Sequence, residues 1–103
     1  MDIRDVLLKN VMIMDLKATT KAAAIDELVH QYYVKGIIND EELYKKDIIK
    51  REAESTTGIG DGIAMPHAKN KAVTRATVLF AKSDAGVDFD ALDGQPVHLF
   101  FMI

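Results

Sequence analysis

The sequence has no cysteine among its 103 residues. A disulfide framework, a cysteine-based zinc site and a thiol nucleophile are therefore excluded within this chain, and the absence agrees with a reducing compartment. The sequence also has no excess of basic residues, since 13 Lys and Arg stand against 16 Asp and Glu. Because nonspecific binding to a phosphate backbone needs a concentrated basic face, we expect no nucleic-acid partner.

Long apolar runs are absent as well. No uninterrupted apolar run approaches the ~20 residues that cross a bilayer, and residues 1–5 carry charges where a signal peptide needs its apolar core. We expect a soluble cytoplasmic protein without direct membrane insertion. Repeats and linkers are also missing, and the content of 49% hydrophobic and 28% charged residues is typical of one globular domain.

The first half of the chain predicts one strand and two helices. Residues 11–14 form a short apolar run, which favours a strand buried on both faces. A helix follows, with Thr19 or Thr20 as its N-cap and Gly36 at its C-terminal end. Its apolar residues recur at helical spacing: Ile25, Leu28, Val29 and Tyr32. A second helix is expected to open at Asn39, with Glu42 as its capping partner, and to fade near residues 55–56.

The second half predicts a loop followed by strands. Three glycines within residues 58–62 make regular structure costly there, which indicates a shaped loop. Strands are expected at about residues 76–81 and at 97–103, with turns at 84–86 and 93–94 between them. Alternating strands and helices predict an α/β fold, a mixed sheet with helices on both faces.

His67 is the histidine whose surroundings suggest chemistry. It follows Pro66, which restricts the local backbone, and the glycine-rich segment, which lets other groups approach closely. An imidazole has an ordinary pKa of ~6.5, so near neutral pH its free ring nitrogen can act as base, ligand or nucleophile. The alternative interpretation is a loop histidine that faces solvent.

Arg51 and the hydroxyl residues 55–57 precede His67 by a short stretch of chain. A guanidinium, nearby hydroxyls and glycine N–H groups suit a phosphoryl group, whose oxygens accept several charge-assisted hydrogen bonds. The alternative for Arg51 is a solvated arginine that complements the helix dipole.

Three other patterns carry less weight. The glycine pattern at 58, 60 and 62 lacks the preceding strand of a dinucleotide-binding turn. The three histidines lack the paired spacing of a metal site, so no metal ligand is assigned. The acidic residues of the later segment lack the calcium-loop pattern; they are Asp84, Asp88, Asp90 and Asp93.

Two segments carry a family resemblance. Arg51-Glu52 followed by STTGIGDGIAMPHA at residues 55–68 resembles the active-site signature of the fructose/mannitol class of enzyme IIA domains in the bacterial phosphoenolpyruvate-dependent sugar phosphotransferase system. GVDFDALDGQPVHL at residues 86–99 is similar to the fructose branch. The resemblance covers essentially the whole chain.

The resemblance implies a phosphoryl relay. His67 matches the residue that accepts a phosphoryl group on Nε2 from the carrier protein HPr and passes it to a cysteine of an enzyme IIB domain, which works with membrane-bound enzyme IIC. Arg51 matches the arginine that steadies the phosphoryl group, and Ser55 and Thr57 are candidates for the pocket lining. No cofactor and no metal is implied.

The resemblance also implies a longer domain. The family continues past the strand predicted at 97–103 and carries a second active-site histidine there, a role that we transfer to no residue of this chain because His98 lies too early. We therefore expect residues 1–103 to be one enzyme IIA domain that lacks its C-terminal part. A regulatory protein of the same fold, of the nitrogen-related or transcription-regulator type, is the second hypothesis.

Overall fold

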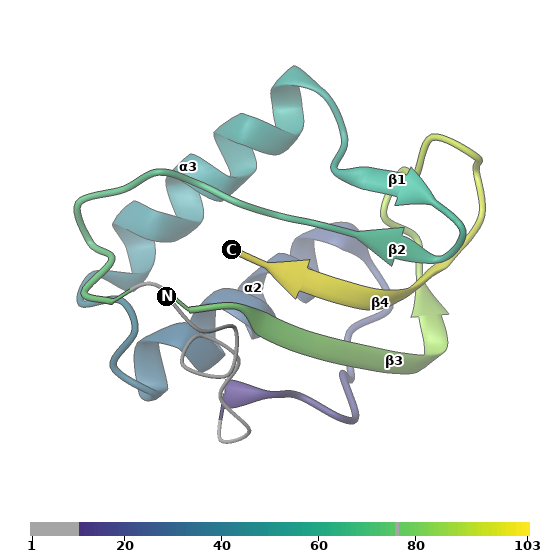
Figure 1. Ribbon diagram of the computed structural model, residues 1–103. Coiled ribbons are helices and arrows are strands. Elements are labelled where there is room, and N and C mark those ends of the chain that lie inside the picture. Colours follow the sequence, from purple (N-terminus) through teal and green to yellow (C-terminus); the bar gives the residue numbers. More distant parts are fainter. Residues whose placement is uncertain (1–10, 76) are drawn as a thin grey trace.

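The computed structural model describes residues 11–75 and 77–103 (Figure 1). Within them lie two helices and a sheet of four strands. In chain order they are α2 (Lys21–Val34), α3 (Glu41–Glu54), β1 (Gly58–Gly60), β2 (Ile63–Ala64), β3 (Leu79–Val87) and β4 (Val97–Met102).

The sheet is mixed, with the strand order β1-β2-β4-β3. β1 and β2 form an antiparallel hairpin, β2 runs parallel to β4, and β3 pairs antiparallel with β4. β2 and β4 are far apart in sequence, so their parallel pairing brings the segment after the hairpin beside the end of the chain (Figure 1). The α/β fold with a mixed sheet is confirmed.

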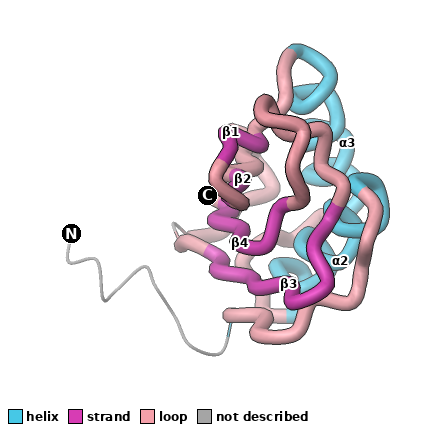
Figure 2. The backbone as a smooth tube through the Cα atoms, turned by 90° about the vertical axis from the view of Figure 1, so that its right-hand side faces the viewer, coloured by secondary structure: helices cyan, strands magenta, loops and turns pink. Residues whose placement is uncertain are grey.

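Both helices lie on the same side of this sheet (Figure 2). The connection between α2 and α3 is short, so the two helices pack against each other, with the rings of Tyr32 and Tyr44 5.9 Å apart. Both tyrosines are fully buried. The expected helical layer on the second face does not occur in residues 11–75 and 77–103.

The helix ends follow the sequence closely. The hydroxyl of Thr20 accepts a hydrogen bond from the backbone N–H of Ala23 and caps α2. Gly36 has a φ of +74°, the left-handed conformation expected after the helix. α3 begins one residue later than predicted, because Asp40 caps it while the N–H of Asn39 donates to the carbonyl of Ala72.

The prediction of a strand buried on both faces at residues 11–14 was wrong. Ile13 forms a single parallel bridge with Ala81 at the outer edge of β3. Its N–H donates to the carbonyl of Phe80, and its carbonyl accepts from Lys82. Only one edge of the sheet is available there, and the side chain of Met14 is 59% exposed.

The prediction of an irregular loop at residues 58–62 was also wrong, because these residues form most of the β1–β2 hairpin. Gly60 and Gly62 adopt positive φ angles of 110° and 76° around the turn, and Asp61 between them has a φ of 56°. The glycines therefore allow the chain to reverse within a hairpin.

The later strands differ in their limits. β3 spans Leu79–Val87 and not 76–81, so the turn predicted at 84–86 lies inside the strand. The pairing shifts register between Lys82 and Val87, where Gly86 has a φ of 87° and donates its N–H to the hydroxyl of Ser83. A bulge accommodates the turn-forming residues. β4 agrees with the strand predicted at 97–103.

Asp93 ties the β1–β2 turn to the segment before β4. Its carboxylate accepts hydrogen bonds from the backbone N–H groups of Asp61 and Gln95 at 3.0 and 3.1 Å, and these bonds lower the pKa of Asp93 from its ordinary value of 3.8. A lowered folded-state pKa stabilises the fold above the unfolded-state pKa, and this contribution disappears as the pH falls through the folded-state pKa.

We therefore expect Asp93→Asn to have a lower free energy of unfolding than the wild type near pH 7. The difference in free energy between the two proteins is expected to become smaller as the pH falls below about 4. Urea denaturation monitored by circular dichroism across this pH range measures the effect. Asp90→Asn is the matched control, since Asp90 is also exposed in the same segment. If the difference in unfolding free energy between Asp93→Asn and the wild type does not change with pH, the lowered pKa of Asp93 does not stabilise the fold.

Candidate functional site

His67 lies just beyond β2, in the segment that continues alongside β4. The N–H of Ile103 donates to the carbonyl of Pro66 at 3.2 Å, which extends the parallel pairing of β2 and β4 up to the histidine. Pro66 is buried, whereas His67 is exposed. The sheet therefore holds the backbone while the ring faces solvent.

The ring of His67 is oriented by its own backbone. Nδ1 lies 3.0 Å from the carbonyl oxygen of Met65. A carbonyl oxygen can only accept a hydrogen bond, so Nδ1 carries the proton in this contact. In the neutral ring Nε2 then keeps its lone pair.

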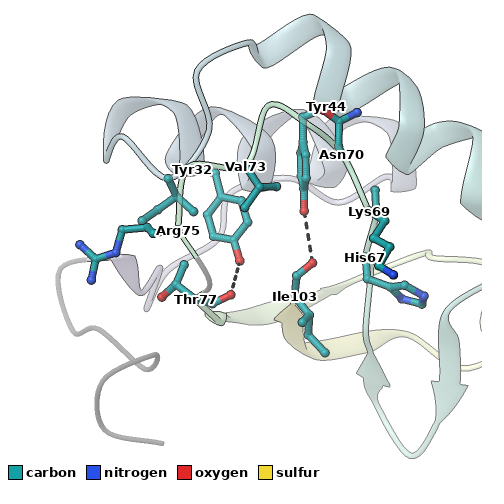
Figure 3. A pocket seen from close by; sticks show the side chains of 11 residues that line it. Tyr32, Tyr44, His67, Lys69, Asn70, Val73, Arg75, Thr77 and Ile103 are labelled. Carbon is teal, nitrogen blue, oxygen red and sulfur yellow. Dashed lines mark hydrogen bonds between the residues drawn. The ribbon is translucent and has the colours of Figure 1, made fainter. Parts of the chain in front are cut away.

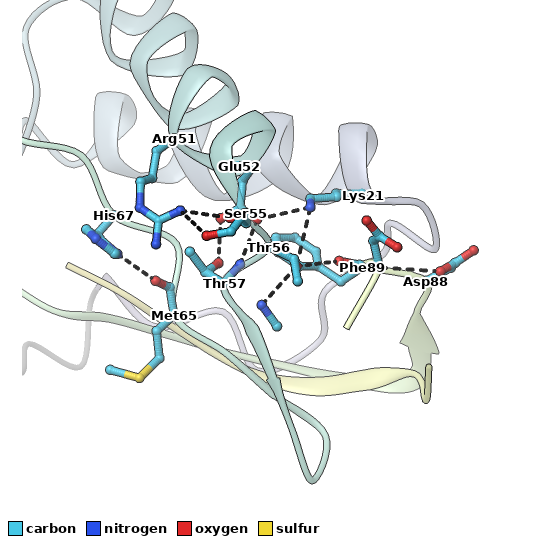
Figure 4. Close-up of polar contacts among 12 residues, drawn as sticks. Lys21, Arg51, Glu52, Ser55, Thr56, Thr57, Met65, His67, Asp88 and Phe89 are labelled. Carbon is cyan, nitrogen blue, oxygen red and sulfur yellow. Dashed lines mark hydrogen bonds and ion pairs between the residues drawn. The ribbon is translucent and has the colours of Figure 1, made fainter. Parts of the chain in front are cut away.

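Arg51 approaches from the last turns of α3 (Figure 4). Its Nη1 donates to the carbonyl oxygen of Ser55 at 2.7 Å and lies 3.4 Å from the Ser55 hydroxyl. The first of these contacts fixes the guanidinium at the C-terminal end of the helix, where orphan carbonyls need donors. Ser55 is therefore placed as a partner of Arg51.

One pocket of about 340 Å³ brings most of the predicted site residues together. Its lining residues come from α3, the link between α3 and β1, the β1–β2 hairpin, the segment after the hairpin and the residue after β4: Arg51, Thr56, Thr57, Ile59, Met65, His67 and Ile103. His67, Arg51 and Thr57 thus share one cavity. Ser55 is not among its lining residues and contacts it through Arg51.

The hydroxyl of Thr57 is already engaged. It donates to the Oε2 atom of Glu52, and the backbone N–H of Thr57 donates to Oε1 of the same carboxylate at 3.0 Å. Thr57 is only 4% exposed. In this arrangement the hydroxyl supports the pocket wall.

Behind that wall the buried carboxylate of Glu52 forms an ion pair with Lys21, whose side chain is 24% exposed. Lys21 Nζ lies 3.0 Å from Glu52 Oε1, and the Glu52 side chain is only 4% exposed. Sequence reasoning missed both residues. Glu52 follows Arg51 directly in the signature, but Lys21 lies far away in the sequence, at the start of α2, so only the fold brings it to Glu52.

A larger cavity of about 490 Å³ (Figure 3) shares the lining residues His67 and Ile103 with the 340 Å³ pocket. The rings of Tyr32 and Tyr44 lie in its wall, and their hydroxyls donate to the carbonyls of Met102 and Ile103. Burial raises the pKa of Tyr44 to about 12 and that of Tyr32 further. Both phenols are therefore neutral donors that hold the end of β4 against the helices.

The other two histidines lie elsewhere. His30 on α2 contacts Glu41 through Nδ1 at 3.1 Å. His98 on β4 contacts the carbonyl of Ser83 through Nδ1 at 2.8 Å. Within residues 11–75 and 77–103, no group of three metal-ligating side chains could hold a metal ion, and no helix is long and apolar enough to cross a membrane.

Similar proteins were found by sequence and by structure. The chain is 44% identical over 103 residues to the fructose-specific EIIABC component of Bacillus subtilis, and 45% identical over 84 residues to the fructose-specific EIIA component of Haloferax volcanii. The alignments cover 100% and 82% of this chain. They span only 16% and 54% of the two relatives.

The fold is shared with a crystal structure of the nitrogen regulatory protein IIA-Ntr from Neisseria meningitidis. The TM-score is 0.86 at 28% identity, and the superposition covers 97% of this chain and 68% of that chain. The matching family is described as "Phosphoenolpyruvate-dependent sugar phosphotransferase system, EIIA 2", and residues 5–103 match it. The resemblance drawn from the signature is thus confirmed, and the chain belongs to the EIIA 2 family of phosphotransfer components.

Proposed function

We propose that this chain is the phosphoryl-carrying component of a fructose-type sugar phosphotransferase. His67 accepts a phosphoryl group from the phosphohistidine of HPr and passes it to a cysteine of an enzyme IIB domain. The fructose-specific relatives support the sugar class. The cysteine-free sequence agrees with a cytoplasmic location.

The contact between His67 Nδ1 and the Met65 carbonyl carries the proposal. It leaves Nε2 as the unprotonated nitrogen of an exposed ring, beside a pocket that Arg51 also lines. A lone pair that points away from the backbone can attack phosphorus in line with a leaving group. The phosphoryl group therefore goes to Nε2.

The first phosphoryl transfer requires no added acid or base. The lone pair of Nε2 forms a bond to phosphorus while the bond between phosphorus and the donor nitrogen breaks, and the electron pair returns to the donor imidazole. The proton on Nδ1 stays in its hydrogen bond to Met65. Arg51 supplies positive charge close to the phosphoryl oxygens, which carry the developing charge of the transition state.

The second transfer runs in reverse at His67. A thiolate attacks phosphorus, the bond to Nε2 breaks, and its electron pair returns to the ring. Because these 103 residues contain no cysteine, the thiolate belongs to another domain. The name EIIABC of the Bacillus relative supports an enzyme IIB partner and an enzyme IIC partner.

Two earlier hypotheses stay open. A regulatory role is supported by the fold shared with a nitrogen regulatory protein at a TM-score of 0.86, but the higher identity to fructose-specific relatives favours sugar transport. The expectation that the family domain continues beyond residue 103, with a further active-site histidine, stays a prediction.

The test is incubation with phosphoenolpyruvate, enzyme I and HPr, followed by nitrogen-15 and phosphorus-31 NMR of the product. We expect one acid-labile phosphoryl group on Nε2 of His67. Addition of a fructose-type IIB domain is then expected to move the label to the IIB cysteine. Phosphorylation at Nδ1 would contradict the site, and label that stays on His67 would favour the regulatory role.

A further inference from the structure

We propose that the ion pair between Lys21 and the buried Glu52 carboxylate is a positioning element that fixes the ring tautomer of His67. The role rests on the proposed function, because it matters for phosphoryl transfer only if Nε2 of His67 is the nucleophile. Neither residue touches His67. The pair acts through the backbone of the β1–β2 hairpin.

The Glu52 carboxylate holds the chain where it leaves α3. Its two oxygens accept hydrogen bonds from the backbone N–H and from the hydroxyl of Thr57 (Figure 4). The Glu52 carboxylate therefore restrains both the backbone and the side chain of Thr57. A carboxylate can accept both bonds because it has only acceptor atoms. Thr57 is thereby fixed in position and in rotation.

Thr57 passes this constraint to the histidine through two hydrogen bonds. Its carbonyl accepts the N–H of Met65 at 3.1 Å, and the carbonyl of Met65 accepts Nδ1 of His67 at 3.0 Å. The Met65 N–H and the Met65 carbonyl belong to consecutive peptide groups, so a shift of Thr57 displaces Met65 and with it the acceptor on which the Nδ1–H tautomer depends. Without that acceptor no hydrogen bond holds the proton on Nδ1, so the Nε2–H tautomer gains population.

Lys21 compensates the free-energy cost of burying the Glu52 carboxylate. A buried charge is costly unless a counter-charge and hydrogen bonds compensate it. Lys21 Nζ lies 3.0 Å from Glu52 Oε1, 3.5 Å from the hydroxyl of Thr56 and 4.8 Å from the centre of the Phe89 ring. Its position at the start of α2 thus links both helices to the hairpin.

The Lys21–Glu52 ion pair has a second contact with the start of the hairpin, through Thr56. The hydroxyl of Thr56 accepts the N–H of Gly58 at 3.1 Å and donates to the carbonyl of Phe89 at 3.1 Å. Since Lys21 contacts Thr56 while Glu52 contacts Thr57, two consecutive residues before β1 depend on the same ion pair. The beginning of the hairpin is therefore set by groups outside the pocket.

The experiment reads the histidine tautomers of the unphosphorylated 103-residue chain by nitrogen-15 NMR of the imidazole rings. In the wild type we expect the Nδ1–H tautomer for His67 and also for His98, whose Nδ1 contacts the Ser83 carbonyl. Glu52→Ala and Lys21→Met are expected to give mixed tautomers at His67 while His98 stays unchanged. Glu52→Gln, which keeps one acceptor for Thr57, is expected to lie between Glu52→Ala and wild type.

The matched control is Lys45→Met, which removes a lysine of similar exposure from its ion pair with Asp26, whose side chain is 60% exposed, and is expected to leave the tautomer of His67 unchanged. In the phosphorylation assay, Lys21→Met is expected to lower the maximal rate by roughly tenfold or more, with the KM for phospho-HPr retained, because small misplacements of a reacting atom are costly. A lowered rate with an unchanged tautomer would overturn the proposal.

The outcomes separate this inference from the proposed function. A wild-type His67 without the Nδ1–H tautomer, a folded Lys21→Met variant with an unchanged His67, or equal changes at His67 and His98 would each overturn the positioning role. If Glu52→Ala does not fold, the His67 tautomers of Lys21→Met and Glu52→Gln test the positioning role. A tautomer change at His67 without any phosphorylation of the wild type would instead overturn the proposed function.

Discussion

Replacement of His67 by alanine is expected to abolish phosphorylation of the chain by phospho-HPr. No other nitrogen in the 340 Å³ pocket combines a free lone pair with exposure, since Arg51 stays protonated. The fold should survive, because the ring is exposed and its Nδ1 donates to the Met65 carbonyl of its own segment. Intact-mass measurement after incubation with the donor system detects the loss, and thermal unfolding checks the fold.

His98→Ala is the matched control for this loss. The ring of His98 makes the same kind of contact through Nδ1, to the Ser83 carbonyl, but it lies on β4 outside the pocket lining. We expect His98→Ala to accept the phosphoryl group as the wild type does. Label that persists in His67→Ala and disappears in His98→Ala would reverse the assignment.

Replacement of Arg51 by alanine is expected to lower the rate of phosphoryl transfer by roughly a hundredfold, the usual effect of removing one preorganised charged donor from a transition state. Arg51→Lys is expected to recover part of the rate, because lysine restores the charge but not the planar fork of donors. Rapid-quench kinetics with phospho-HPr measures both variants.

Lys46→Ala is the control for Arg51, since it removes a positive charge from the exposed side of α3 at a residue that lines none of the pockets that His67 lines. We expect a rate within a fewfold of wild type. Arg51 also donates to the Ser55 carbonyl, so the unfolding free energy of each variant is compared as well. Equal slowing by Lys46→Ala and Arg51→Ala would indicate a general charge effect in place of a specific contact.

The local elements were predictable where short-range chemistry decides them. Thr20, Gly36 and the apolar spacing of α2 lie within one continuous segment, and the structure follows them. Predictions failed where pairing with a distant segment decides the outcome. Residues 11–14 pair only with the edge of β3, and the glycines at 58–62 turn a hairpin because β1 and β2 pair there.

The candidate site shows the same division. The signature around His67 and Arg51 was readable from the sequence, because the family resemblance is carried by consecutive residues. The partners of the Ser55 and Thr57 hydroxyl groups could not be predicted from the sequence. Thr57 was predicted as a candidate for the pocket lining and does line the 340 Å³ cavity, but the sequence did not indicate that its hydroxyl donates to the Glu52 carboxylate.

The family, the limits of α2 and the absence of an internal thiol follow from the sequence alone, since each of these depends on residue identities or on neighbours within a few positions. The tertiary structure decided which nitrogen of His67 is free and which charges support it. Those properties depend on contacts such as the Met65 carbonyl with the His67 ring and Lys21 with Glu52. Such contacts are set by the direction of a peptide group and by the packing of two helices against a hairpin, which residue order alone does not specify.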